Sequence, residues 1–310
     1  MKTPPPNSPT EKSAWHVLGA GAIGGLWALR MARLGIPVTL LAHGDSSGTR
    51  ELSIEEKSGA FSQHFPEVRV ADSGTITQLL VCTKAQLTAS AITPLLGQLQ
   101  SGATVLLLQN GMGQEDWLQR ERPDICLLTG SSTDGVWRHD RDHLVQAGLG
   151  ETFIGATEAD NRSPARALAE SLNDERWPVH FDADIKKRRW LKLAMNCAIN
   201  PLTALYRCRN GELLEKPEAL ATMLRVCAEV AEVMKAEGMT TDTETLFTAV
   251  CAAATKTAAN ISSMHADVAT GRETEIAFIN GYVLARAASH GIAAPANQSL
   301  LTQISALPHH

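Results

Sequence analysis

The stretch that decides the fold is HVLGAGAIG, residues 16–24, which carries the pattern G-x-G-x-x-G. Apolar residues precede the pattern and an amphipathic stretch follows it, as at a junction between a strand and a helix. In such a junction the first glycine permits a tight turn, the second lets the backbone approach a pyrophosphate, and the third lets the helix pack closely on the strand. The pattern therefore predicts a dinucleotide-binding turn. Its residues are Gly19, Ala20, Gly21, Ala22, Ile23 and Gly24.

Short apolar runs alternate with helical stretches around this turn. The predicted strands are residues 17–18, 37–42, 79–82 and 104–108. Residues 22–34 read as a helix closed by Gly35 and Pro37. This alternation predicts a parallel α/β sheet, and residues 145–154, interrupted by Gly148 and Gly150, predict a later antiparallel pair.

The second half of the chain has a different character. Its predicted helices are residues 184–200, 217–237, 242–260 and 273–290, without strand signals between them. We therefore expect an α/β fold with a Rossmann-type dinucleotide-binding domain over residues 14–183 and an all-helical domain over residues 184–310. Residues 1–13, rich in Pro, Ser and Thr, read as a disordered tail.

Composition excludes several classes of function. A chain of 310 residues that is 44% hydrophobic suits two domains, and a net charge of −5 gives no basic footprint for nucleic acid. The run Lys186–Arg189 reads as a solvated helix end. No apolar run approaches the roughly 20 residues that span a bilayer. We expect a soluble cytoplasmic protein, a monomer or homodimer, without a membrane or nucleic-acid partner.

The six cysteines show no C-x-x-C spacing and no accompanying histidine cluster. Most of them lie in apolar runs, which is typical of buried thiols in a reducing compartment. The sequence therefore predicts no disulfide and no metal site.

The end of the second strand bears on the choice of cofactor. An NAD enzyme usually has a carboxylate there for the ribose hydroxyls, whereas this strand ends in Ala42-His43 and the next carboxylate is Asp45. The missing carboxylate favours NADPH. His43 is a candidate donor to the 2′-phosphate, and Arg50 adds charge if its loop folds back; the alternative is that both are plain loop residues.

Several polar residues follow predicted strands or lie within a mostly apolar predicted helix. Lys84 and Asn110 each follow a predicted strand, where ligands of open α/β sheets bind, although Asn110 also suits an ordinary turn. Lys192, Asn196 and Asn200 share one helix face, which is costly unless the face is paired, functional or turned to solvent.

Two further candidates lie near the C-terminus. Asn260 and Ser263 share a face if their stretch is helical. Glu275 follows the break at Gly271, at the start of a predicted helix, where a carboxylate also complements the helix dipole.

Together these strings resemble the ketopantoate reductases (2-dehydropantoate 2-reductases) from about residue 14 to the C-terminus. The resemblance is carried by LGAGAIG (18–24), QNGMG (109–113), KLAMNCAINPLTA (192–204), NGEL (210–213), NISSM (260–264) and ETEI (273–276). The lysine and asparagine string with NISSM is far more specific than the glycine turn.

The resemblance implies NADPH-dependent reduction of ketopantoate to (R)-pantoate, a step of pantothenate and coenzyme A synthesis, with substrate held between a Rossmann and a helical domain. It implies that Lys192 is the general acid and that Glu275 contacts cofactor and substrate. The implied cofactor residues, besides the glycine turn, are Lys84, Asn110 and Val136, and the end of the second strand adds His43. The implied substrate residues are Lys192, Asn196, Asn200, Asn210, Asn260, Ile261, Ser262 and Ser263.

The general chemistry of hydride transfer to a ketone agrees with this implication. The cofactor carries the hydride step, while the protein orients the ketone and stabilises its oxygen as charge develops. Alternatives are a related NADPH-dependent 2-oxo acid reductase, a 3-hydroxyacid or glycerol-3-phosphate dehydrogenase, and a catalytically idle NADPH-binding protein. One departure concerns the cofactor, because the family often has Arg where this chain has His43.

Overall fold

The computed structural model describes residues 13–42, 44 and 46–308. The predicted disordered tail therefore lies almost entirely outside the described residues, as does His43. The chain divides into two compact units. The first unit comprises residues 1–83, 88–108 and 118–183, and the second comprises residues 84–87, 109–117 and 184–310.

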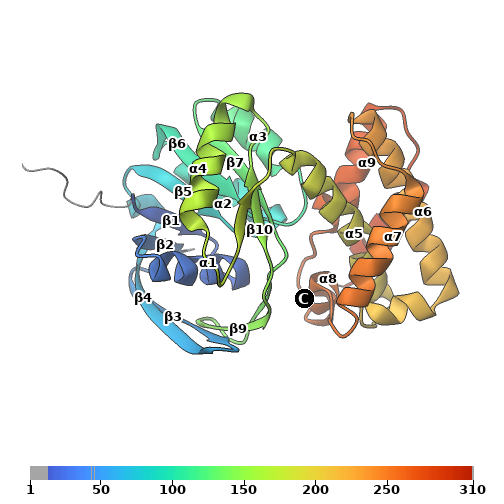
Figure 1. Ribbon diagram of the computed structural model, residues 1–310, viewed down its shortest axis with the longest axis horizontal. Helices are drawn as coiled ribbons and strands as arrows, with labels where there is room; N and C mark the ends of the chain where they lie inside the picture. Colours follow the sequence, from blue (N-terminus) through green and yellow to red (C-terminus); the bar gives the residue numbers. More distant parts are fainter. Residues whose placement is uncertain (1–12, 43, 45, 309–310) are drawn as a thin grey trace, which may run out of the picture. The chain divides into compact units, whose positions relative to one another are not determined.

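The first unit is built on a parallel sheet. Six neighbouring strands of the described chain form its core in the order β4-β2-β1-β5-β6-β7 (Figure 1). Their bounds are Trp15–Leu18 (β1), Val38–Ala42 (β2), Gly59–Arg69 (β4), Ile76–Val81 (β5), Leu99–Leu107 (β6) and Cys126–Ser132 (β7). This is the strand order of a doubly wound dinucleotide-binding sheet, with the order reversing between β1 and β5. The predicted fold class is confirmed, and the four predicted strands fall on β1, β2, β5 and β6.

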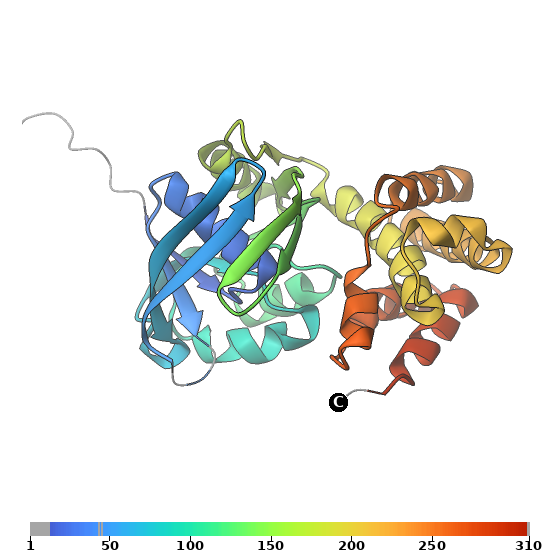
Figure 2. The same ribbon diagram turned by 90° about the horizontal axis from the view of Figure 1, so that it is seen from below.

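Five further strands extend the sheet at both ends, to the order β11-β10-β7-β6-β5-β1-β2-β4-β3-β9-β8. They are Gly48–Glu56 (β3), Gly135–Arg138 (β8), His143–Gly148 (β9), Thr152–Gly155 (β10) and Val179–Phe181 (β11). Figure 2 shows the long β3–β4 hairpin in blue with β9 in green alongside.

The predicted antiparallel pair over residues 145–154 is wrong. β9 pairs with β8 and β3, whereas β10 pairs with β7 and β11, so the two segments lie at opposite ends of the sheet. Their glycines do break the chain, but each segment finds its antiparallel partner elsewhere.

Helices and strands of the first unit share one apolar core. Helix α1 (Ala22–Arg33) and helix α4 (Arg162–Leu172) contribute side chains to it together with the central strands. Buried Arg30 crosses this core and forms a bidentate ion pair with Asp134, at 2.7 Å. Because breaking a buried pair leaves an uncompensated charge, this pair fixes α1 to the segment after β7. The remaining helices outside the C-terminal region are α2 (Thr88–Ile92) and α3 (Gln114–Glu121).

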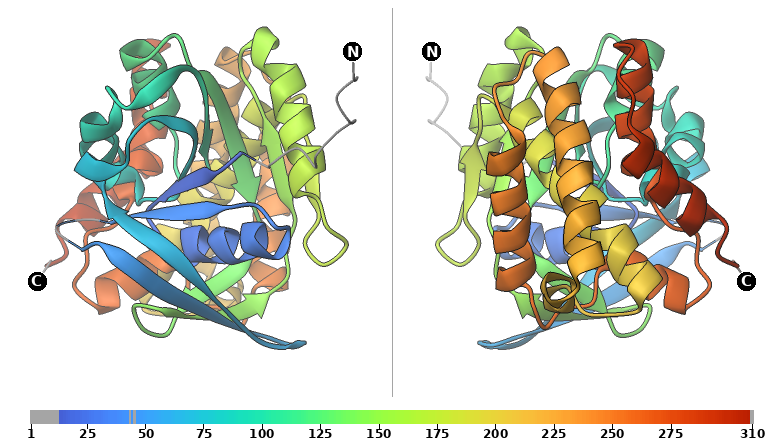
Figure 3. Two further views of the ribbon diagram at one scale, coloured as in Figure 1. Left: turned by 90° about the vertical axis from the view of Figure 1, so that its left-hand side faces the viewer. Right: turned by 90° about the vertical axis from the view of Figure 1, so that its right-hand side faces the viewer.

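The second unit contains the long helices. They are α5 (Ile185–Tyr206), α6 (Pro217–Ala236), α7 (Thr243–Lys256), α8 (Ser263–Ala269), α9 (Asn280–Ser289) and α10 (Pro295–Ser305). Helix α5 packs against α6, α7 and α8, and the right panel of Figure 3 shows α6 and α7 alongside each other. Their apolar faces form a second core, separate from the first.

Two of the predicted helices differ from the observed ones. The stretch 273–290 begins with a 3₁₀ turn, Ile276–Phe278 (η6), and becomes α-helical only at Asn280. The first predicted helix runs on to Tyr206, because Pro201 lies within α5 without ending it. The other 3₁₀ turns are Val70–Asp72, Ala85–Leu87, Thr93–Leu95, Ala159–Asn161 and Gly211–Glu215.

Candidate functional site

Backbone crowding explains two of the three glycines in the turn after β1. Gly19 has a φ of +89°, and a Cβ there would lie 2.6 Å from the backbone nitrogen of Thr83, at the end of β5. A Cβ on Gly24 would lie 2.2 Å from the carbonyl oxygen of Gly19. Only glycine therefore lets the turn pass close to β5 and lets α1 approach the turn.

Gly21 is different, because a Cβ there would meet no atom within 4 Å. Packing within the protein thus gives no reason for a glycine at this position. Gly21 is also the N-cap of α1, without a side-chain cap and without an acidic residue in the first turn. The first N–H groups of a helix lack intrahelical partners, and they attract anions. Open space beside uncapped N–H groups fits a pyrophosphate.

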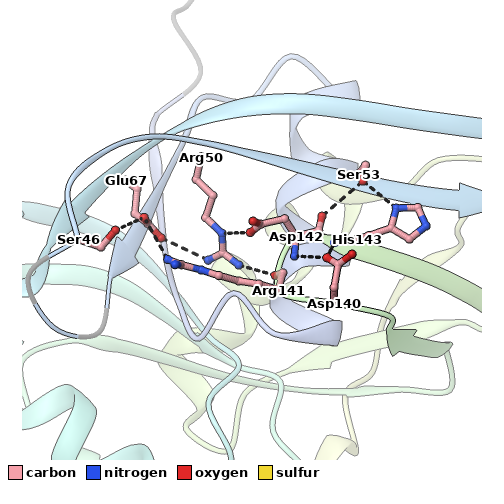
Figure 4. A network of polar contacts seen from close by, with 8 residues as sticks. All are labelled: Ser46, Arg50, Ser53, Glu67, Asp140, Arg141, Asp142 and His143. Atoms are coloured by element: carbon pink, nitrogen blue, oxygen red, sulfur yellow. Dashed lines mark hydrogen bonds and ion pairs between the residues drawn. The ribbon is translucent and has the colours of Figure 1, made fainter.

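Arg50, a candidate for the 2′-phosphate, lies on β3 and is already engaged. Its guanidinium donates to Asp142 at 2.6 Å, to the carbonyl oxygen of Arg141 at 2.7 Å and to Glu67 at 3.3 Å. Figure 4 shows this network, in which Ser46 also donates to Glu67 at 2.8 Å. The structure therefore gives Arg50 a role in holding β3, β4 and the β8–β9 turn together. Val136, also in the first unit, is half-buried on β8.

In the second unit, α5 carries the polar face predicted from the sequence. Lys192, Asn196 and Asn200 all lie within this helix at intervals of four residues, and all three are half-buried. Most of their neighbours on α5 are buried apolar residues of the second core. Between residues 190 and 202 of α5, Lys192, Asn196 and Asn200 are therefore the polar members of an otherwise apolar stretch.

Glu275 is a buried carboxylate, 9% exposed. One of its oxygens accepts a hydrogen bond from the backbone N–H of Ala85 at 3.0 Å. Burial raises the pKa of Glu275, while that hydrogen bond and the charges of Lys84 and Lys192 oppose the rise. Glu275 and Lys192 therefore belong to one electrostatic cluster. Glu275 is also the N-cap of a 3₁₀ turn of three residues, and a turn so short has too small a dipole to explain a carboxylate at this position.

Sequence reasoning missed Asp267 on α8, which is 6% exposed. Its carboxylate contacts Lys84 at 2.8 Å and Arg272 at 3.0 Å. Lys84 also donates to the carbonyl oxygen of Glu273 at 3.2 Å. Asp267 thus fixes the lysine that follows β5. No local pattern in the sequence marks Asp267, because its partner Lys84 lies far away along the chain.

The segment around Asn110 is anchored within the second unit. Gly111 has a φ of +73°, and the N–H of Met112 donates to the carbonyl oxygen of Phe278 at 3.1 Å. Arg189 and Glu115 brace this segment, since their side chains pair at 2.6 Å and the N–H of Gly113 donates to Glu115 at 3.1 Å. Asn110 itself is half-buried beside this braced turn.

The same ion pair corrects the prediction that residues 186–189 form a solvated helix end. Arg189 is only 8% exposed, and Lys186 pairs with Glu237 at 3.0 Å. Burial would raise the pKa of Glu115, but the Arg189 charge outweighs it and the pKa lies below its ordinary value. The basic run fails as a solvated face because its partners come from distant parts of the chain.

Asn210 is buried and joined to the segment near Asn260. Its N–H donates to the carbonyl oxygen of Asn260 at 3.1 Å, and its Nδ2 donates to Thr257 at 2.9 Å. Its Oδ1 is buried with no hydrogen-bond partner in the described part of the chain. A buried acceptor of this kind ordinarily has a partner.

Asn260 and Ser263 do not share a helix face, because α8 begins only at Ser263. Asn260, Ile261 and Ser263 are exposed, whereas Ser262 is buried. The Ser262 hydroxyl caps α8 by accepting from the N–H of His265 at 3.1 Å, and it lies 2.6 Å from the Thr203 hydroxyl of α5. Ser262 therefore ties the start of α8 to α5.

The described residues also bear on the predictions about disulfides, metal sites and membrane spans. All six cysteines are free thiols, three buried and three half-buried. No group of three or more His, Cys, Asp or Glu side chains among the described residues is placed to hold a metal ion. No helix in the described ranges is both long and apolar enough to cross a membrane.

Comparisons with known proteins cover nearly the whole chain. The family model "Ketopantoate reductase PanE/ApbA" matches residues 15–159, and its C-terminal model matches residues 184–307. The 2-dehydropantoate 2-reductase of Vibrio cholerae is 36% identical, over 94% of this chain and 96% of that protein. The enzyme of the same name from Escherichia coli O157:H7 is 35% identical, over 93% of each chain.

Solved structures agree with this assignment. A probable 2-dehydropantoate 2-reductase from Bacillus subtilis superposes with a TM-score of 0.80 at 27% identity, covering 95% of this chain and 100% of that one. A D-mandelate dehydrogenase has a TM-score of 0.86 over 95% of this chain and 98% of that one, but at 21% identity it shares the fold alone. The family models and the curated relatives together show that this chain belongs to the ketopantoate reductase family.

Proposed function

We propose that the protein reduces 2-dehydropantoate (ketopantoate) to (R)-pantoate with NADPH. The observation that carries this proposal is the polar face of α5, Lys192, Asn196 and Asn200, in a chain that is 36% identical to a 2-dehydropantoate 2-reductase over 94% of its length. A half-buried lysine aligned with two amides suits a substrate with one carbonyl to polarise and further polar groups to bind.

The glycine turn holds the pyrophosphate of the cofactor in this proposal. Uncapped N–H groups at the start of α1 and the open space beside Gly21 support that role. Bound NADPH supplies a hydride to the ketone carbon. Lys84 and Asn110, which follow β5 and β6, are proposed to contact the cofactor, and Asp267 and the Arg189–Glu115 pair hold these two residues in place.

Lys192 is the proposed general acid. Its ammonium group stabilises the substrate oxygen as negative charge develops there, and then donates a proton to that oxygen. Glu275 is buried in the same electrostatic cluster, and we propose that its carboxylate attracts the ammonium group of Lys192 and orients that group toward the reacting oxygen.

The remaining polar residues are proposed to bind the substrate carboxylate and its 4-hydroxyl group. Asn196 and Asn200 extend along α5 from Lys192, and Ser263 and Asn260 are exposed near the start of α8. Asn210, which is hydrogen-bonded to the segment near Asn260, is also proposed to bind the substrate. Ser262, whose hydroxyl caps α8, acts through the position of Ser263.

The test compares two 2-oxo acids that differ by one hydroxyl group. We expect NADPH oxidation with ketopantoate at a kcat/KM far above that for 3,3-dimethyl-2-oxobutanoate, which lacks only the 4-hydroxyl. A site that hydrogen-bonds a hydroxyl rejects the analogue without it by about 10⁴-fold or more when the site groups are left unpaired. Equal kcat/KM values for the two acids would contradict the proposed substrate.

A further inference from the structure

The strand beside β2 ends in an arginine at the place where the cofactor ribose is bound in this type of sheet. β2 and β4 are parallel neighbours, and Arg69, the last residue of β4, pairs in register with Ala42, the last residue of β2. Neighbouring strands lie about 4.8 Å apart. In dinucleotide-binding sheets the end of the second strand faces the 2′ position of the adenosine ribose, and a nearby arginine accommodates a 2′-phosphate.

Among the described residues near this edge, Glu67 and Arg50 already have charged or polar partners. Glu67, two residues before Arg69, is buried and accepts hydrogen bonds from Ser46 and Arg50 (Figure 4). The guanidinium of Arg50 also donates to Asp142 and to the carbonyl oxygen of Arg141. This network satisfies the carboxylate of Glu67 and occupies the guanidinium of Arg50, so Arg50 is not placed to bind a ligand phosphate.

Arg69 differs from Arg50 in its surroundings. Its side chain is 46% exposed, and its Nε donates to Asp72, whose side chain is 49% exposed. Exposed ion pairs contribute little stability, because water screens both charges. A phosphate dianion offers a guanidinium a stronger, bidentate partner than such a pair, so it competes well with Asp72.

We infer that Arg69 recognises the 2′-phosphate of NADPH and that Asp72 holds the arginine at the strand end until the cofactor binds. The inference rests on the proposed use of NADPH and adds a residue that determines its preference over NADH. Arg69 acts on the phosphate alone and has no part in proton or hydride transfer.

The test uses the Arg69→Gln variant and two adenosine probes that differ in the phosphate. We expect the variant to bind 2′,5′-ADP about 10- to 100-fold more weakly by calorimetry, the loss typical of a hydrogen bond to a charged group, and to bind 5′-AMP as the wild type does. Its ratio of kcat/KM for NADPH to that for NADH should fall by the same factor. Arg69→Lys should retain part of the affinity, and Asp72→Asn should increase affinity for 2′,5′-ADP.

Arg141→Gln is the matched control, because Arg141 is an exposed arginine that faces Glu67 at 3.7 Å. We expect it to leave the preference for 2′,5′-ADP unchanged. Equal losses for both probes in Arg69→Gln, or no loss for either, would overturn the inference while NADPH use by the wild type still stands. A wild type that binds both probes equally would instead overturn the proposed NADPH preference, and this inference with it.

Discussion

The backbone N–H of Ala85 donates to the buried carboxylate of Glu275 across 190 positions of sequence, at 3.0 Å. This contact joins the segment after β5 to the 3₁₀ turn before α9, both within the second unit. Glu275 is buried here, and burial disfavours the charged form of its carboxyl group, which raises its pKa.

Glu275→Gln should therefore stabilise the fold at neutral pH. Because the pKa of Glu275 is raised in the folded state, its favourable contribution is complete below the unfolded pKa and is lost as pH rises through the folded pKa. The melting temperature of the variant should exceed that of the wild type at pH 8, and the difference should vanish near pH 4. Glu273→Gln, at an exposed neighbour, is the control. A difference independent of pH would rule out this account.

Substitutions in the glycine turn should separate folding from cofactor binding. Gly24→Ala should destabilise the protein, because the added Cβ would lie 2.2 Å from the carbonyl oxygen of Gly19. Gly21→Ala should leave the melting temperature unchanged, since its Cβ meets no protein atom within 4 Å. It should still weaken NADPH binding, measured by fluorescence titration. Unchanged NADPH affinity in Gly21→Ala would mean that the pyrophosphate does not occupy this space.

The Arg189–Glu115 pair should contribute strongly to stability. Arg189→Met leaves Glu115 buried without its partner, at a cost of about 3–5 kcal/mol in urea unfolding. The double variant with Glu115→Leu should recover most of this loss. Because the folded pKa of Glu115 is lowered, the contribution of the pair is present above its unfolded pKa and declines as pH falls through the folded pKa. Additive losses in the double variant would argue against a direct coupling.

Asn200→Ala and Ser263→Ala should weaken ketopantoate binding and leave NADPH affinity nearly intact. Each removes one hydrogen bond to a polar or charged ligand group, worth about 1–3 kcal/mol. The Asn200 substitution preserves the backbone carbonyl that accepts from Thr203 at 2.8 Å, so α5 should remain intact. Ser289→Ala, on α9, is a control. Titrations that show equal losses for substrate and cofactor would make these residues structural instead.

Local patterns predicted the features that depend on local chemistry. The glycine turn was predictable because a tight turn and a close helix approach each demand glycine at a set position. The polar face of α5 was predictable because three residues at intervals of four share a face of any helix.

Features that depend on distant partners escaped prediction. The β3–β4 hairpin is mostly exposed, so its strands lack the apolar runs that mark the central strands. Residues 145–154 carry strand signals, but these do not say that β9 pairs with β3. Arg189 and Asp267 are buried by partners far away in sequence, and no local pattern shows such pairs.

Lys192 is the residue on which the proposed reaction depends. Lys192→Ala should keep the wild-type melting temperature, because a half-buried lysine contributes little packing. Lys192→Arg should also be slow, since a guanidinium keeps its proton too tightly to act as an acid. Lys187→Ala, on the same helix, controls for loss of charge.

The most direct measurement is single-turnover NADPH oxidation by saturating ketopantoate in wild type and Lys192→Ala. We predict rapid oxidation by the wild type and a rate lower by about 10²–10⁴-fold in the variant, the usual contribution of general acid catalysis. A variant rate within a factor of a few of the wild type, at unchanged thermal stability, would contradict the account and remove Lys192 from the reaction.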